Sequence, residues 1–312
     1  MTTPLSLPAL FAAAIVFIST SVFTTASATV SVVDDSGNTV TLTAPAQRIV
    51  SLAPHVTELL FATGAGNQLV GVSEYSDFPT VAKLLPSVGG SGQLDIERIV
   101  SLKPDLIVAW GSGNNRRQLA RLRKLGLTVF ESEPRSFEAI ADSLERLGAL
   151  VGHDEGRLQA QQFRQQVQTL QQRYAGSSRV TVFYQIWSTP LMTLNDAHIV
   201  SHAIQLCGGV NVFGQLKPLV PTISREAVLT ANPDVIIVSD EKGNGLERWR
   251  SFRRMQAVAS GNLMTIDGGI MNRAGPRVIE ATRVLCEQID QARKHTATNG
   301  REALKKPGQT SK

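Results

Sequence analysis

The sequence has few aromatic residues and cysteines, and it lacks the common catalytic motifs. Aromatic side chains make up 5% of its 312 residues, and there are only two cysteines. It contains no G-x-S-x-G nucleophile motif, no P-loop, and no G-x-G-x-x-G after a strand. The glycine-rich segment 89–92 precedes Asp95 and does not open directly into a helix, so it is a weak phosphate site. These absences favour a binding protein over an enzyme.

Long apolar runs are also missing. The run from Leu10 to Ile18 is too short for a membrane span, and no later segment approaches 18 apolar residues. It is followed by Ala26-Ser27-Ala28, a small-x-small site that a signal peptidase cleaves, although no Lys or Arg precedes the run. We expect an exported protein with residues 1–28 as a signal peptide cleaved near Ala28, the alternative being an uncleaved anchor.

Positive charge is concentrated at one end. Residues 293–312 hold six basic residues and one acidic residue, which accounts for the whole net charge of +5. The body of the chain is therefore neutral, and nucleic-acid binding has no support. We expect residues 295–312 to form a disordered basic tail.

Cys207 and Cys286 form an even pair in a chain that we expect to be exported. A disulfide is favoured over a metal or redox site in that compartment, with two buried free thiols as the alternative.

Two segments 129 positions apart are nearly alike, ERIVSLKPDLIV from Glu97 and EAVLTANPDVIIV from Glu226. In each, a Pro-Asp pair follows the glutamate and a run of Leu, Ile and Val comes next, which is typical of a short helix leading into a buried parallel strand. The repeat predicts an α/β fold of two Rossmann-like lobes with mainly parallel sheets, at residues 29–151 and 177–294.

A long helix is predicted between the lobes, within residues 152–176. Its apolar residues form one stripe, and a helix of about 20 residues spans roughly 30 Å. It therefore joins the lobes stiffly, the alternative being a surface helix of one domain. The stripe consists of Leu158, Phe163, Val167, Leu170 and Tyr174.

Side-chain caps are predicted to begin several helices. These caps are Asp95, Ser136, Asp196 and Ser224. A helix from Pro276 to about Lys294 is expected to close the fold.

Candidate ligand-binding residues follow predicted strands. Because parallel α/β sheets bind ligands at the carboxyl ends of their strands, Tyr75, Trp110 and Trp187 are expected to line one cleft. Arg273 is expected to reach it with a fixed charge, and His55 from a helix start. For each of these residues, local packing or capping is the alternative. Trp249 is assigned to the core or surface packing instead.

A metal site has weak support. His198 and His202 lie four apart on a predicted helix, which places both rings on one face. No glutamate stands in an H-E-x-x-H arrangement and no third ligand is evident, so capping or exposed histidines are favoured over a metal-dependent enzyme.

Several segments carry a family resemblance that covers Arg48 to about Arg293. They are RIVSLAPHVTELLFATG, VGVSEYSDFP, DIERIVSLKPDLIVAW, LCGGVNVF, PTISREAVL and RAGPRVIEA. With them the chain resembles the periplasmic substrate-binding proteins whose two lobes are joined by one backbone helix, and among these the cobalamin-binding branch of ABC importers. The resemblance implies a periplasmic, monomeric transport protein without a cofactor of its own, and a Cys207–Cys286 bond.

The resemblance also implies roles for particular residues. Glu97 and Glu226 match glutamates that contact arginines of the two permease subunits. The alternative is that each glutamate only interacts favourably with the dipole of its own helix. Tyr75, Trp110 and Arg273 match residues around the corrin pocket. Two tryptophans of that pocket are replaced by Ser91 and Val220, and Trp187 stands where the family has a smaller residue. The implied ligand is cobalamin or a related corrinoid, with haem or a ferric siderophore as alternatives.

Overall fold

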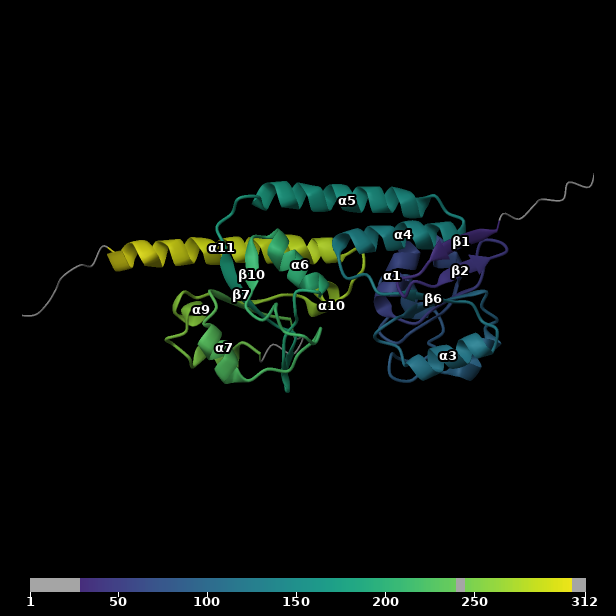
Figure 1. Cartoon of the computed structure of the whole chain (residues 1–312), viewed down its shortest axis with the longest axis horizontal. Coiled ribbons are helices and arrows are strands. Elements are labelled where there is room, and N and C mark those ends of the chain that lie inside the picture. The colour runs from purple at the N-terminus through teal and green to yellow at the C-terminus, as the bar shows by residue number, and fades with distance from the viewer. Residues whose placement is uncertain (1–28, 240–244, 305–312) are drawn as a thin grey trace, which may run out of the picture.

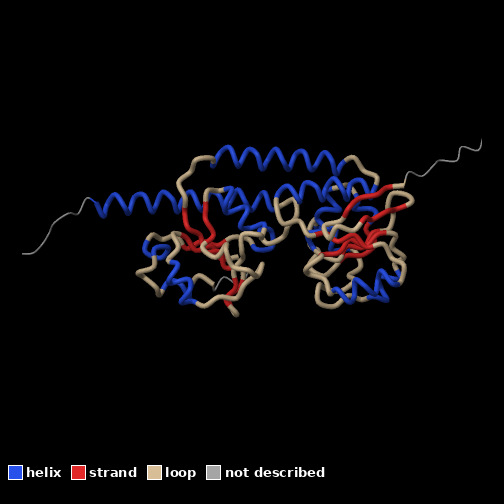
Figure 2. Tube along the Cα trace, viewed as in Figure 1, coloured by secondary structure: helices blue, strands red, loops and turns tan. Residues whose placement is uncertain are grey.

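A computed structural model describes residues 29–239 and 245–304, with side chains to residue 296. Two α/β lobes lie side by side, and long helices run along one side of both (Figure 1). Each lobe holds a four-stranded parallel sheet in its interior (Figure 2). No helix in the described ranges is long and apolar enough to cross a membrane. The predicted signal peptide lies outside these ranges.

The first lobe has strand order β4-β3-β5-β6, and all its pairs are parallel. One core cluster packs α1 and α4 against one face of the sheet, and a second packs α2 and α3 against the other. The elements are β3 Ile49–Ser51, α1 Pro54–Ala62, η1 Ala65–Gln68, β4 Leu69–Val72, η2 Thr80–Leu84, α2 Ile96–Ser101, β5 Leu106–Trp110, α3 Arg116–Lys124, β6 Val129–Ser132 and α4 Phe137–Val151.

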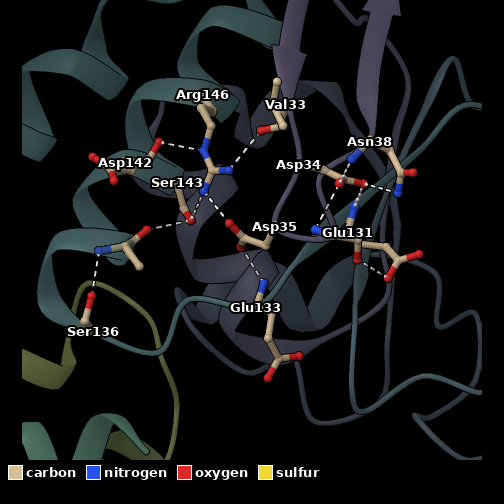
Figure 3. A network of polar contacts seen from close by, with 12 residues as sticks. Val33, Asp34, Asp35, Asn38, Glu131, Glu133, Ser136, Asp142, Ser143 and Arg146 are labelled. Carbon is tan, nitrogen blue, oxygen red and sulfur yellow. Dashed lines mark hydrogen bonds and ion pairs between the residues drawn. The ribbon is translucent and has the colours of Figure 1, made fainter. Parts of the chain in front are cut away.

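An antiparallel hairpin precedes this lobe, formed by β1 Val30–Val33 and β2 Thr39–Leu42. Arg146 of α4 fixes it, donating to the Val33 carbonyl at 2.9 Å and to the Asp35 carboxylate at 2.6 Å (Figure 3). The β1 strand is partly exposed along its length and lacks a strong buried pattern.

The predicted bridging helix is α5 Glu155–Tyr174, which runs from the end of α4 to the beginning of the second lobe. Arg164 binds it to α4 through three carboxylates, at 2.7 Å from Glu138, 2.8 Å from Asp142, and in contact with Glu145. These hydrogen bonds, above all the one to Glu145, raise the pKa of Arg164. The helix is therefore held firmly on the first lobe.

The predicted stripe of α5 is correct except at one position. Phe163, Val167, Leu170 and Tyr174 are buried, but Leu158 is 48% exposed. Near that end the two helices approach too closely for a large residue, since a Cβ on Gly156 would lie 2.4 Å from a carbonyl oxygen of α4. Small residues make the contact there.

The second lobe has strand order β10-β7-β11-β12, again all parallel. One core cluster packs α7, α8 and α9 against one face of this sheet, and α6 and α11 cover the other face. Trp249 is buried in the cluster that contains α7. The elements are β7 Val180–Gln185, β8 Trp187–Ser188, β9 Leu191–Met192, α6 Ile199–Leu206, β10 Gly209–Asn211, α7 Arg225–Ala231, β11 Val235–Val238, α8 Glu247–Arg250, α9 Gln256–Ala259, β12 Leu263–Thr265, α10 Gly268–Met271 and α11 Val278–Leu304.

Three of the four predicted caps are confirmed, at Asp95, Ser136 and Ser224. The prediction for Asp196 is wrong. The α6 helix begins later, and the ring of His198 accepts the capping hydrogen bond from the Val200 amide at 3.2 Å. A turn that the Asn195 side chain stabilises occupies the residues where the helix was expected to begin.

The aspartates of the two Pro-Asp repeats have the same structural role. Asp105 accepts a hydrogen bond from the Arg48 amide at 3.0 Å, just before β3. Asp234 accepts one from the Thr181 amide at 2.8 Å, at the start of β7. Each aspartate precedes a strand, β5 or β11, and thus connects the amino-terminal end of that strand to the amino-terminal end of its neighbour, β3 or β7.

A disulfide joins Cys207, at the end of α6, to Cys286 of α11, with an S–S distance of 2.00 Å. Both cysteines are fully buried. The α11 helix continues to Leu304, beyond its predicted end near Lys294, and the rest of the predicted tail lies outside the described residues.

We expect Cys207→Ala with Cys286→Ala to lower the free energy of unfolding by about 4 kcal/mol, because the bond closes a long loop in the unfolded chain. The two residues are 79 apart in sequence. Urea denaturation followed by circular dichroism measures this. The folded wild-type protein should react slowly with a reductant, since neither sulfur is exposed. Equal stability of the double variant and the wild type would contradict the prediction.

Candidate ligand-binding site

Two predicted site residues meet at the carboxyl ends of the first sheet. His55 begins α1 after β3, and Trp110 ends β5. Their ring centroids are 5.6 Å apart in an edge-to-face arrangement. Asn114 accepts a hydrogen bond from the Trp110 amide at 2.7 Å and so fixes its backbone. The indole lies over Gly113, where a Cβ would be 1.9 Å from the ring.

The His55 imidazole is buried and neutral. Only 6% of the residue is exposed, and its Nε2 atom has no hydrogen-bond partner in the described part of the chain. Burial, and secondarily the charge of Arg273, lowers the pKa of His55 to about 4. At neutral pH the ring therefore brings no charge to the site.

Tyr75 lies in the loop after β4 and is 80% exposed. Its backbone has φ of 62°, a left-handed conformation that is uncommon for a bulky residue. The loop lines a depression of about 510 Å³ whose wall consists of residues 72–77, Ala82, Lys83, Leu85 and Ser87. The phenol is thus presented to solvent at the edge of a hollow surface.

An ion-pair cluster that the sequence did not predict joins this lobe to the connection between α10 and α11. Its four residues are Glu58, Asp77, Arg273 and Arg277, and we call it the Glu58 cluster. Arg277 contacts both oxygens of Glu58, at 2.6 and 3.1 Å. Arg273 lies 2.6 Å from Asp77 and 3.4 Å from Glu58.

The cluster also fixes the Tyr75 loop. Arg273 donates to the Tyr75 carbonyl at 3.3 Å, and the Arg277 guanidinium lies 3.8 Å from the centre of the Phe78 ring. Burial by itself lowers the pKa of Arg273, but the hydrogen bond that Arg273 donates to Asp77, together with the charges of Asp77 and Glu58, raises it overall. Burial by itself raises the pKa of Asp77, but the hydrogen bond from Arg273 and the positive charges of Arg273 and Arg277 together lower it. Both groups are ionised at neutral pH.

Trp187 does not join these residues. It lies on the β8–β9 hairpin, is 52% exposed, and donates from Nε1 to the Thr189 carbonyl at 2.9 Å. Within the described ranges it forms no ring contact or hydrogen bond with the other four predicted residues. The structure therefore pairs His55 with Trp110 and Tyr75 with Arg273, and leaves Trp187 separate.

Glu97 and Glu226 occupy matching positions. Each is exposed at the second residue of its helix, α2 or α7. Hydrogen bonds from its own backbone amide and from the Ser224 hydroxyl lower the pKa of Glu226. Both helices cover the sheet faces opposite to those that α4, α6 and α11 cover.

The first histidine of the weak metal hypothesis has a local role. His198 caps α6, and burial lowers its pKa to about 4. Among the described residues, no group of three or more His, Cys, Asp and Glu side chains is placed to hold a metal ion.

Glu58 and Arg277 are the residues that sequence reasoning missed. One signal was present, because a lone carboxylate among Val56, Leu59 and Leu60 on an apolar helix needs a buried partner. The partner is more than 200 residues away in the chain, and local patterns do not identify it.

Two α/β lobes with parallel sheets, a stiff connecting helix, and aromatic and charged residues beyond the strand ends define a two-lobed ligand-binding protein. The chain belongs to the periplasmic binding protein family, which matches residues 49–268.

The relatives include vitamin B12-binding proteins. That of Vibrio cholerae serotype O1 is 39% identical over 252 residues, covering 80% of this chain and 91% of the relative. The crystal structure of the periplasmic vitamin B12 binding protein BtuF of Vibrio cholerae has a TM-score of 0.76, covering 80% of this chain and 99% of that one. A periplasmic heme-binding protein from Roseiflexus sp. RS-1 shares the fold. Its sequence is 23% identical and its TM-score is 0.68, covering 79% of this chain and 99% of that one.

Replacing Glu58 with Gln is expected to lower the free energy of unfolding by about 3 kcal/mol, because removing one partner of a buried ion pair leaves the other uncompensated. Thermal and urea unfolding measure the change. Glu97→Gln is the matched control, since that exposed glutamate forms no ion pair with a described residue, and it should change stability by less than about 0.5 kcal/mol. A similar loss of stability in the two variants would show that the Glu58 cluster does not hold the first lobe against the beginning of α11.

Proposed function

We propose that this protein is a periplasmic receptor that captures cobalamin or a related corrinoid and delivers it to an inner-membrane ABC importer. The observation that carries the proposal is the 39% identity to a vitamin B12-binding protein, which extends across both lobes and is accompanied by a TM-score of 0.76. The structural relative at 23% identity supports the shared fold and says nothing about this ligand.

The site chemistry supports a large, flat, mostly uncharged ligand. Trp110 and Tyr75 offer aromatic faces, and the neutral His55 ring lies against the first of them. Arg273 supplies a fixed charge at the same end of the lobe. A corrin ring has apolar faces and a rim of amides, which suits apolar contacts with few polar anchors. In this proposal Trp187 contributes a contact from the second lobe.

Haem or a ferric siderophore is the second candidate, and one observation favours it. The Tyr75 phenol is 80% exposed at the edge of the depression, where its oxygen is accessible to a ferric ion. The oxygen of an ionised tyrosine is an axial ligand of haem iron.

Glu97 and Glu226 dock the protein on the importer in this proposal. Two exposed carboxylates at equivalent positions of two similar lobes fit a symmetric pair of basic permease subunits. The interaction of each glutamate with its own helix dipole explains its local position but not the pairing.

The remaining parts of the proposal follow from the same assignment. Residues 1–28 are a signal peptide cleaved near Ala28, residues 29–151 and 177–294 are the lobes, and residues 152–176 connect them. The mature protein acts as a monomer, has no catalytic activity and carries the corrinoid as cargo.

Titration of the mature protein with cyanocobalamin, cobinamide and haemin tests the ligand. We expect micromolar or tighter corrinoid binding by calorimetry and no shift of the haem absorption band. Trp110→Ala should weaken corrinoid binding by about tenfold or more, as aromatic anchors commonly do. A tyrosinate-haem spectrum that Tyr75→Phe abolishes would overturn the corrinoid assignment and establish the second candidate.

Replacing Glu97 and Glu226 together with Ala should abolish stimulation of the importer's ATPase while leaving corrinoid affinity intact. The matched control is Glu155→Ala with Glu287→Ala, which removes two exposed glutamates from α5 and α11. If the first pair weakens corrinoid binding instead, these glutamates belong to the ligand site.

A further inference from the structure

The exposed surface of α3 is strongly basic. Five of the nine residues of α3 are Arg or Lys, and none is acidic. Leu119 and Leu122 are buried against the sheet, so the charged residues project outward. Arg123 is paired with Glu131 at 2.5 Å. The other four form no ion pair with any residue that the structure describes, and they are Arg116, Arg117, Arg121 and Lys124. We call these four the basic face of α3.

The basic face lies on the side of the lobe that carries Glu97. The helices α2 and α3 share one core cluster, on the sheet face away from α1, α4 and α5. Figure 1 shows α3 at the bottom of its lobe and α5 at the top, and α7, which carries Glu226, at the bottom of the second lobe. The basic face therefore points in the direction in which the two glutamates would meet an importer.

The second lobe has a smaller basic counterpart. Arg253 and Arg254 precede α9, on the sheet face that α7 also covers, and both are exposed. Neither forms an ion pair with a described residue. By contrast, the acidic residues of α4 are engaged with Arg164 on the far side of the molecule. The unpaired basic residues of α3 and of the segment before α9 therefore lie on the sides of the two sheets away from α4 and α11.

We propose that the basic face of α3 binds the anionic phospholipid headgroups of the membrane that surrounds the importer. This inference rests on the proposed delivery to an inner-membrane importer, because a receptor docked through Glu97 brings α3 toward the bilayer. Charge complementarity favours the lipid, since guanidinium groups bind phosphates with two parallel hydrogen bonds.

An exposed apolar residue strengthens the argument for a bilayer over an acidic protein. Leu125 follows the last turn of α3 and is 54% exposed beside Lys124. Basic residues flanking an exposed large aliphatic side chain are typical of surfaces that lie at the headgroup boundary. Long Arg and Lys side chains keep their charges with the phosphates while their stems cover apolar surface.

Vesicle sedimentation of the full mature protein tests the proposal, using phosphatidylcholine vesicles with and without phosphatidylglycerol. Each basic residue near an anionic bilayer strengthens binding about fivefold. We therefore expect Arg117→Gln, Arg121→Gln and Lys124→Gln in one chain to lower partitioning on the order of 100-fold. Binding of the wild type should require phosphatidylglycerol and weaken as salt rises.

The matched control removes three exposed arginines from the α5 side, Arg157→Gln, Arg173→Gln and Arg283→Gln, and should leave partitioning nearly unchanged. Equal vesicle binding by the α3 variant and the wild type would overturn the proposal and assign the binding to another region, such as the basic carboxyl-terminal segment. The proposal would also be overturned if the wild type did not bind vesicles and the α3 variant failed to stimulate the importer in detergent. That result would identify a contact between α3 and a protein. Corrinoid titration of the same samples separates these outcomes from failure of the proposed function.

Discussion

The arrangement of the candidate site depends on one buried carboxylate. The Glu58 side chain is 3% exposed, and a single ionised carboxylate at that depth would strongly destabilise the fold. Arg277 and Arg273 compensate it, and both come from the connection that enters α11. The first lobe and the beginning of α11 are therefore held together by an interaction that neither part makes alone. Tyr75 and Asp77 take their places around the same two arginines.

The lobes are thus joined in two different ways. The α5 helix is a covalent connection, and Arg164 holds it against α4 through three carboxylates. The Glu58 cluster is a second, non-covalent connection. The Cys207–Cys286 bond adds rigidity within the second lobe by joining α6 to α11. Two separated connections restrict how far one lobe rotates against the other, so we infer that ligand capture involves modest closure.

The duplicated segment places two kinds of residue at different ends of each lobe's βα unit. Its strands end near candidate ligand residues, as β5 does at Trp110. Its helices begin with the exposed glutamates and lie with α3 on the side away from α5. The candidate ligand residues and the exposed glutamates therefore lie at different edges of the same βα units.

Periodicity and capping chemistry allowed most of the fold to be predicted. The short helix and buried strand of each repeat and the caps at Asp95, Ser136 and Ser224 agree with expectation, because they depend on local signals. Local signals failed at Asp196, where a turn delays the helix, and at Leu158, which lies on the exposed side of α5.

Local patterns were enough to predict the two-lobed α/β class, the paired glutamates and the apolar faces, since each depends on neighbours within a few turns. Three contacts became visible only in the folded chain: Glu58 meets Arg273 and Arg277, Trp187 lies apart from His55 and Trp110, and the basic residues of α3 share the side of Glu97. Ion pairing and burial depend on distance in space, and the order of residues does not specify that distance across 200 positions of chain.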